Sequence, residues 1–356
     1  MCNIKVYIEV VKTKTNGGFG SERNQDLHFC LSETFFVKGE LCMSWIKYIA
    51  KKIITILVIM LIVSAFVFMA LRLSKADPLT VCIGNSRSTE QLRQQYTTEY
   101  HLDQPVFKQY MIWLKGVFTG DLGTDWVTKQ DIGLQITQRI PVTIGLVLFS
   151  TIIGTLLAIL LGVFSARMRG TWADSVISVF MLIVSSVPTF LLGIIVIILF
   201  AQFVPGYSFI GTFSNFGEYI QRLMIPSIVM ALSLVALLGR VTRSSMIQQF
   251  QSSYITTAEA KGISRKSIIY KHAFHNGVIP VLTVAGYMFA ASIGSTVLVE
   301  TIFSLPGIGG LLITAIQQNN FPVTQVLVLI MLAAYMIMSF VVDVLYAVID
   351  PRVSLQ

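Results

Sequence analysis

The chain has 356 residues, of which 54% are hydrophobic and only 12% are charged, and its mean hydropathy is +0.73. Soluble domains carry about 25% charged residues, so this composition excludes an ordinary soluble enzyme and indicates an all-α polytopic membrane protein. The net charge of +8 does not indicate nucleic-acid binding, because the basic residues follow a membrane-topology pattern instead.

Residues 1–42 contain no apolar run and resemble neither a signal peptide nor a transit peptide. We expect an N-terminal extension that is disordered or that reflects an upstream start site; a real regulatory extension is the alternative. The spacing of the four cysteines supports neither a zinc site nor a disulfide framework, and we expect no metal or cofactor. The first transmembrane helix is predicted over 43–74, because Met43 precedes a Lys-rich flank and an apolar run.

Six uncharged runs approach or exceed the roughly 20 residues that span a bilayer. They are 53–71, 142–166, 175–203, 223–239, 277–299 and 321–342. Basic residues flank the first run, follow the second and fill the loop after the fourth, whereas 204–222 and 300–320 carry only Arg222. This asymmetry predicts six helices with both termini in the cytoplasm.

The segment 75–140 is too long for a plain connector. Its stretches 88–100 and 104–118 look amphipathic, which predicts a small, partly helical external subdomain. A further short external helix is expected within 300–320. The rest of the chain is predicted to be a five-helix core over 141–349 and a cytoplasmic tail over 350–356.

The core contains a basic, Gly-punctuated loop over 242–277. Gly262 is expected to end a helix, because glycine tolerates left-handed backbone angles, and Ser264 is a candidate N-cap for a second short helix from about Arg265. Ala258 and Ala260 are small enough for close backbone approach. An ordinary basic cytoplasmic loop is the alternative interpretation.

Two rows of small residues permit close helix packing: Gly154, Ala158 and Gly162 in the second run, and Gly286, Ala290 and Gly294 in the fifth. Packing inside the subunit is one interpretation, and a subunit interface or translocation path is the other, which we favour for the fifth run. Pro188 and Pro226 are expected to kink the third and fourth helices, with a hinge as a possibility.

None of the six runs contains an acidic, basic or histidine residue at depth, which argues against an ion-coupled transporter. Asp343, near the last run, is expected to pair with a cytoplasmic arginine rather than to relay protons. The chain has no phosphate-binding G-x4-G-K-[ST] loop and no G-x-S-x-G motif, so any energy input must come from another subunit.

Several segments resemble the oligopeptide, dipeptide and nickel permease family of ABC importers, in its first, B-type member. They are TTAEAKG with the later Ile-Pro pair, HLDQPVFKQYMIWLKGVFTGDLGTDW, QRIPVTIGLVL, VETIFSLPGIGG and DVLYAVIDPRV. The matches cover most of 45–353 in order. The sequence departs from the family at Ala76, at His101 where Gly is usual, at Asn319-Asn320 where Arg-Asp is common, and at Ser339.

This resemblance implies a type I permease fold in the plasma membrane of a prokaryote and no enzymatic activity in this chain. It implies four kinds of partner: a second homologous permease, two ATP-binding subunits, an extracytoplasmic substrate-binding protein and membrane lipid. It assigns ATPase coupling to Thr256, Thr257, Ala258, Glu259, Ala260, Lys261, Gly262, Arg265 and Lys266. Ala258 and Ala260 would fill the docking groove, and Arg265 and Lys266 would contact the ATPase.

The function we predict is import of short peptides by alternating access. Import of a nickel–chelator complex is the alternative within the family. A non-transporting scaffold or receptor component, and then a channel or secondary transporter, are the alternatives from other classes.

Overall fold

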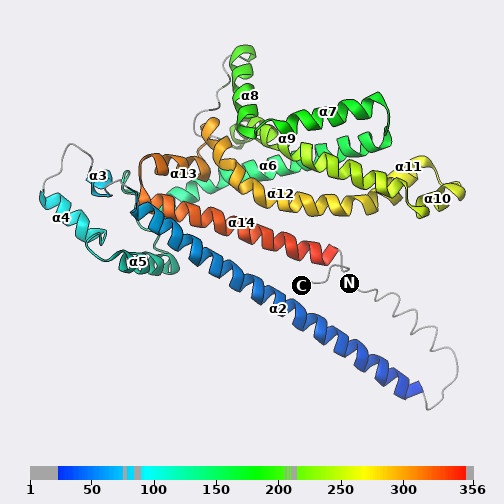
Figure 1. Ribbon diagram of the computed structural model, residues 1–356, viewed down its shortest axis with the longest axis horizontal. Helices are drawn as coiled ribbons and strands as arrows, with labels where there is room; N and C mark the ends of the chain where they lie inside the picture. The colour runs from blue at the N-terminus through cyan, green and yellow to red at the C-terminus, as the bar shows by residue number, and fades with distance from the viewer. Residues whose placement is uncertain are drawn as a thin grey trace. The chain divides into compact units, whose positions relative to one another are not determined.

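The computed structural model in Figure 1 is built from helices. It describes residues 23–74, 78–83, 90–204, 207, 209 and 215–349. These residues form no β-strand, and only an isolated bridge joins Thr124 to Asp131. The chain divides into a large unit, Ile56–Arg352, and a small one formed by Met1–Thr55 and Val353–Gln356.

The helices follow the order that the apolar and amphipathic runs predict. They are α2 (Arg23–Arg72), α3 (Pro78–Ile83), α4 (Glu90–Glu99), α5 (Val106–Thr119), α6 (Ile132–Arg167), α7 (Trp172–Ser186), α8 (Thr189–Phe203), α9 (Phe216–Phe250), α10 (Ser253–Ala260), α11 (Arg265–Ser267), the π-helix η1 (Ile268–Ala273), α12 (Phe274–Ile302), α13 (Ile308–Gln317) and α14 (Phe321–Ile349). The helices expected within 88–100, 104–118 and 300–320 are confirmed as α4, α5 and α13.

Five helical segments are long and apolar enough to cross a membrane: Lys47–Arg72, Ile132–Arg167, Phe216–Phe250, Arg265–Ile302 and Phe321–Tyr346. A sixth span exists if the bent pair α7 and α8 counts as one. The all-α polytopic fold class is therefore confirmed for the described residues.

The third predicted span is not one kinked helix. α7 and α8 meet at 101°, with the break at Val187 and Pro188. Proline has no N–H to donate and pushes the preceding residue towards extended angles, and Val187 accordingly has φ −96° and ψ 124°. A 2.7 Å hydrogen bond between the hydroxyls of Thr189 and Ser233 fixes the break to α9. Pro226, in contrast, lies buried inside a continuous α9.

The first row of small residues packs inside the subunit. α6 and α9 lie side by side. They run in the same direction, because Gly154 faces Leu234, and about two turns further along both helices Gly162 faces Thr242. Ala158 is fully buried between them. A β-carbon built on Gly162 would lie 2.5 Å from Thr242 Cβ and 2.8 Å from the Gly239 carbonyl oxygen. The lack of a side chain at Gly154 and Gly162 therefore allows the close spacing of these two helices.

Gly162→Ala is expected to destabilise the fold by about 1–3 kcal/mol, because the extra methyl group overpacks a backbone contact. The matched control is Gly294→Ala on α12, where a β-carbon meets nothing within 4 Å. Thermal unfolding in detergent should show a lower Tm for the first variant and an unchanged or higher Tm for the second. Equal Tm values would contradict this account of the α6–α9 contact.

The second row of small residues is split between the inside and the surface. Gly286 packs against Val342 of α14, and Ala290 is 1% exposed. Gly294 is exposed, with open space around it. Only Gly294 therefore remains available for an interface with another subunit or a pathway.

The residues before the first span differ in part from the expectation. α2 begins at Arg23, so 23–42 is helical rather than disordered, and no proline interrupts the chain between this stretch and the membrane helix. Residues 1–22, Ala76 and the predicted tail 350–356 lie outside the described residues.

Candidate functional site

The segment between α9 and α12 forms a helix–turn–helix that projects from the ends of the long helices (Figure 1). α10 ends at Ala260, and Gly262 follows with φ +74°, a left-handed angle that suits glycine. The Gly262 N–H donates to the Glu259 carbonyl (2.9 Å), and Ile263 N–H donates to the Ala258 carbonyl (3.2 Å). The predicted turn at Gly262 is confirmed.

The second short helix begins at Arg265 behind Ser264, as expected, but Ser264 makes no side-chain cap. This helix does not stop before the membrane. α11, η1 and α12 form a continuous helical rod over Arg265–Ile302, and 242–250 belong to α9. The predicted loop 242–277 is therefore much shorter, because counting uncharged runs ignores helical turns that extend beyond the apolar region.

A small apolar cluster fixes this segment to the long helices. Ile255 and Ala258 of α10 and Ile268 of η1 belong to one buried cluster. The same cluster contains Ala166 of α6 and Met246 of α9. Ala258 is only 7% exposed. Its methyl group therefore faces its own chain, and the role of filling a partner's groove does not suit it.

The other predicted coupling residues share one property, which is exposure. They are Thr256, Thr257, Glu259, Ala260, Lys261, Gly262, Arg265 and Lys266. Tyr270 is 62% exposed on the same segment, and sequence reasoning missed it. Its signal was an aromatic residue inside a basic, otherwise polar stretch, which is typical of interface anchors.

Next to this segment, a charged cluster joins three long helices. Arg243 of α9 donates from Nε and from a terminal nitrogen to the two carboxylate oxygens of Asp174 on α7, both at 2.8 Å. The hydroxyl of Ser165 on α6 donates to the same carboxylate (2.6 Å). Asp174 is 5% exposed, so the cluster holds the ends of α6, α7 and α9 in register. Arg243 is one of the basic residues after the fourth apolar run that indicate topology, and sequence reasoning missed its partner Asp174.

A buried carboxylate lies where the opposite end of α6 meets the end of α12. Glu300 of α12 is fully buried; Oε1 accepts from the Thr143 hydroxyl (2.7 Å) and Oε2 from the Gly310 N–H (2.9 Å). The Thr143 hydroxyl also accepts from the Ile308 N–H (2.9 Å). Sequence reasoning missed Glu300, because this residue lies directly after the uncharged run 277–299. Its bonds give it a structural role at the start of α13.

Asp343 accepts a 2.8 Å hydrogen bond from the hydroxyl of Tyr287 on α12. A tyrosine is thus the partner shown for it. The arginine partner expected from the sequence stays a prediction.

A buried polar network joins the loop after α5 to the start of α14. Asp125 is 3% exposed, and its Oδ1 accepts from the Asn320 side-chain amide (2.6 Å), while Oδ2 accepts from Gln135 (2.9 Å). Burial raises the pKa of Asp125, but hydrogen bonds from Gln135 and from the Thr128 and Val127 backbone N–H groups outweigh it, so the pKa lies below its ordinary value. The side-chain amide of Asn320 donates to Asp125, whereas an ionised aspartate at position 320 would have no hydrogen to donate.

Asn320→Asp should destabilise the protein by about 2–4 kcal/mol near neutral pH, because two buried carboxylates would share one site. The pair's pKa in the folded state would be raised, so folding would take up a proton and the lost stability would return as the pH falls through that pKa. The control is Asn319→Asp, since Asn319 is exposed. A Tm for Asn320→Asp that matches this control from pH 5 to 8 would contradict the role of the network.

Two family sequence models match this chain. The binding-protein-dependent transport system inner membrane component matches residues 158–355, and the N-terminal membrane component of the same systems matches 45–147. The chain belongs to this permease family. The family resemblance stated from the sequence is thus confirmed.

The permease also has curated relatives over most of its length. A Brucella abortus protein with the provisional name of peptide transport system permease is 35% identical over 86% of this chain and 98% of the relative. The dipeptide transport system permease DppB of Lactococcus lactis is 32% identical over 87% and 100%. The oligopeptide transport system permease AppB of Bacillus subtilis is 31% identical over 86% and 99%.

Among solved structures, the crystal structure of an amino acid ABC transporter with histidines matches at 14% identity and a TM-score of 0.48, over 62% of this chain and 95% of that chain. Family membership and the apolar helices make the permease a multi-pass membrane protein. It is a non-enzymatic component of a transport system that contains other subunits.

Proposed function

We propose that this permease imports short peptides across the cytoplasmic membrane of a prokaryote, driven by ATP hydrolysis in partner subunits. Its relatives of 31–35% identity that align over nearly their whole length are named as peptide, dipeptide and oligopeptide permeases. The pore would pair this chain with a second permease. Two ATPases would lie on the cytoplasmic side, and a substrate-binding protein on the other.

The observation that carries the mechanism is the continuous helical rod Arg265–Ile302. Its first turn presents Arg265 and Lys266, both exposed, next to the Gly262 turn. A movement of an ATPase docked there would be transmitted directly to α12 because no flexible loop intervenes. The bond from Ser245 Oγ to the Gly277 carbonyl (2.8 Å) would make α9 move with it.

The same segment supports an orientation for the permease. Its exposed basic residues and the basic flank of the first span would both lie in the cytoplasm, and both termini would then lie there too. α10, α11 and the Arg243–Asp174 cluster would form the cytoplasmic end of the permease. The segment 75–140 and α13 would lie outside. Substrate and ATP must each favour a different state of the pore for transport to proceed.

The test is ATP-dependent uptake of a labelled tripeptide by cells or proteoliposomes that contain the complete complex. The double change Arg265→Glu/Lys266→Glu should reduce uptake and ATPase co-purification by about tenfold or more, because it reverses two charges at the docking face. The matched control is Arg167→Glu/Arg169→Glu, which reverses two exposed charges in the α6–α7 turn. The proposal fails if no ATPase co-purifies with the wild type, or if both double variants behave alike.

A further inference from the structure

Helix α5 carries an apolar stripe that the rest of the described chain leaves uncovered. The stripe consists of Phe107, Met111, Leu114 and Phe118, and we call it the α5 stripe. Its spacing of four, three and four residues places the four side chains along one face of the helix. Phe107 is 70% exposed and Phe118 is 75% exposed. Single exposed apolar residues are ordinary, but a continuous stripe with two phenylalanines indicates a surface that another apolar phase covers.

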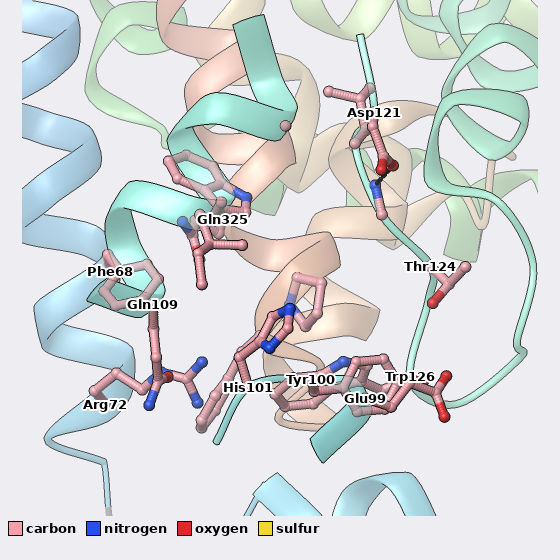
Figure 2. A pocket seen from close by; sticks show the side chains of 17 residues that line it. Phe68, Arg72, Glu99, Tyr100, His101, Gln109, Asp121, Thr124, Trp126 and Gln325 are labelled. Atoms are coloured by element: carbon pink, nitrogen blue, oxygen red, sulfur yellow. Dashed lines mark hydrogen bonds between the residues drawn. The ribbon is translucent and has the colours of Figure 1, made fainter. Parts of the chain in front are cut away.

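The other side of α5 packs into its own chain. Gln109, Trp113 and Gly116 line a cavity between α2, α5 and α14, and Figure 2 shows Gln109 on its wall together with Phe68 of α2. No member of the α5 stripe is among the residues that line this cavity. The helix therefore has two sides, one packed against the protein and one turned towards its surroundings.

Contacts with α2 indicate what these surroundings are. The Tyr110 hydroxyl shares a hydrogen bond with Ser64 Oγ (2.9 Å), and the Tyr110 ring meets the Phe68 ring edge-on, with the centroids 5.4 Å apart. Ser64 precedes Leu71, the last residue of the uncharged run 53–71, by about 10 Å along the helix axis. Tyr110 therefore reaches the part of α2 that lies inside the apolar run.

The surface of α2 around this contact is also apolar and uncovered. Ser64 and Phe68 are buried, whereas Ile62 and Phe66 of the same helix are exposed. Because α2 contains the span Lys47–Arg72, its exposed apolar side chains face lipid. A helix that packs on this span within its apolar run, and that has a second apolar face of its own, meets the same bilayer.

Two lysines border the α5 stripe. Lys108 and Lys115 are both exposed, and their separation of seven residues places them on one line along the helix. Lys108 Nζ donates to Gln104 Oε1 (3.0 Å), which uses one of its three N–H groups. Ammonium groups on flexible stems beside an apolar face are typical of helices that lie in the bilayer interface, where they reach lipid phosphates.

We propose that α5 is an interfacial helix whose stripe inserts among phospholipid acyl chains while Lys108 and Lys115 bind the headgroup phosphates. Its partner is the leaflet at that end of α2, which is the outer leaflet in the orientation proposed above. This contact would anchor the segment 75–140 at the membrane surface. The inference goes beyond the proposed function and does not depend on which substrate is transported.

The test is photo-crosslinking of the complete transporter in nanodiscs that contain equal amounts of phosphatidylcholine and phosphatidylglycerol. Separate variants carry Phe107→p-benzoylphenylalanine or Phe118→p-benzoylphenylalanine, which keeps an aromatic ring at each exposed position. Irradiation should join both variants to phospholipid, and mass spectrometry of the digested chain identifies the adduct. The matched control is Gln95→p-benzoylphenylalanine, because Gln95 is exposed on the polar helix α4. Its lipid adduct should be at least about tenfold lower.

The role of the lysines has its own variant. With benzoylphenylalanine at position 118, Lys108→Glu/Lys115→Glu should lower the phosphatidylglycerol share of the adduct at least about twofold, because it reverses two charges at an anionic surface. The matched control is Arg167→Glu/Arg169→Glu, which reverses two exposed charges in the α6–α7 turn and should leave that share unchanged. Equal shares in the two double variants would overturn the placement of the lysines at the headgroups.

Two further results would overturn the inference as a whole. The first is an adduct of position 107 or 118 with a second permease or with an external binding protein, because the stripe would then be a protein interface. The second is a lipid adduct at these positions no larger than that at Gln95, because α5 would then lie in water. Both phenylalanines are exposed, so their variants should keep the wild-type Tm, and lipid adducts formed at that Tm support the interfacial helix.

Discussion

Gly262→Pro is expected to abolish peptide uptake while the permease still inserts into the membrane. Gly262 has φ +74°, whereas a proline ring fixes φ near −65°, so the turn between α10 and α11 cannot form as it stands. The change also removes the N–H that donates to the Glu259 carbonyl at 2.9 Å. A local cost of about 3 kcal/mol lowers the equilibrium constant for forming the native turn roughly a hundredfold. Uptake should fall accordingly.

The measurement compares ATP-dependent uptake with the amount of permease in the membrane and with ATPase co-purification. Gly262→Ala is the matched control, because a β-carbon at this position meets nothing within 4 Å and only the left-handed strain of about 1–2 kcal/mol remains. Uptake should therefore be intermediate for Ala and absent for Pro. Full uptake with the proline variant would refute the coupling role of this turn.

Glu300→Ala is expected to cost about 3–5 kcal/mol of folding free energy, because it opens a cavity and leaves the Thr143 hydroxyl and the Gly310 N–H without an acceptor. The carboxylate packs so closely that a β-carbon on Gly307 would collide with it. The α12–α13 junction would then lose its hydrogen bonds to α6. We expect a large drop in Tm in detergent and reduced peptide uptake.

Glu300→Gln keeps the shape of the side chain and one acceptor oxygen, so its cost should be about 1–2 kcal/mol. The Tm should fall in the order wild type, Glu300→Gln, Glu300→Ala if the hydrogen bonds of Glu300 stabilise the fold. Glu300 would instead act in proton movement if Gln left the Tm unchanged and abolished uptake. An unchanged Tm for Ala would show that the buried bonds contribute nothing.

Local signals were enough to predict much of the fold. Apolar runs predicted the membrane helices, and amphipathic spacing predicted α4 and α5. The Gly262 turn and the helix start at Arg265 followed from backbone preferences of single residues. Such features depend on neighbours a few residues apart, so the sequence contains nearly all the information that they need.

Features that depend on distant residues were missed or wrong. The 101° bend at Pro188 depends on how α8 packs, since Pro226 lies in a helix that continues. The Arg243–Asp174 pair spans 69 residues, Thr143–Glu300 spans 157 and Asp125–Asn320 spans 195. A single sequence does not indicate which polar residues meet across such separations.

The sequence by itself determined that this is a helical membrane permease with an exposed basic segment between two helices, because hydropathy, charge asymmetry and glycine preferences act locally. Only the tertiary structure decided that Ala258 faces inward, that Glu300 is enclosed and that α11 and α12 form one rod. The reason is that burial and hydrogen bonding are properties of packed helices, which only long-range contacts define.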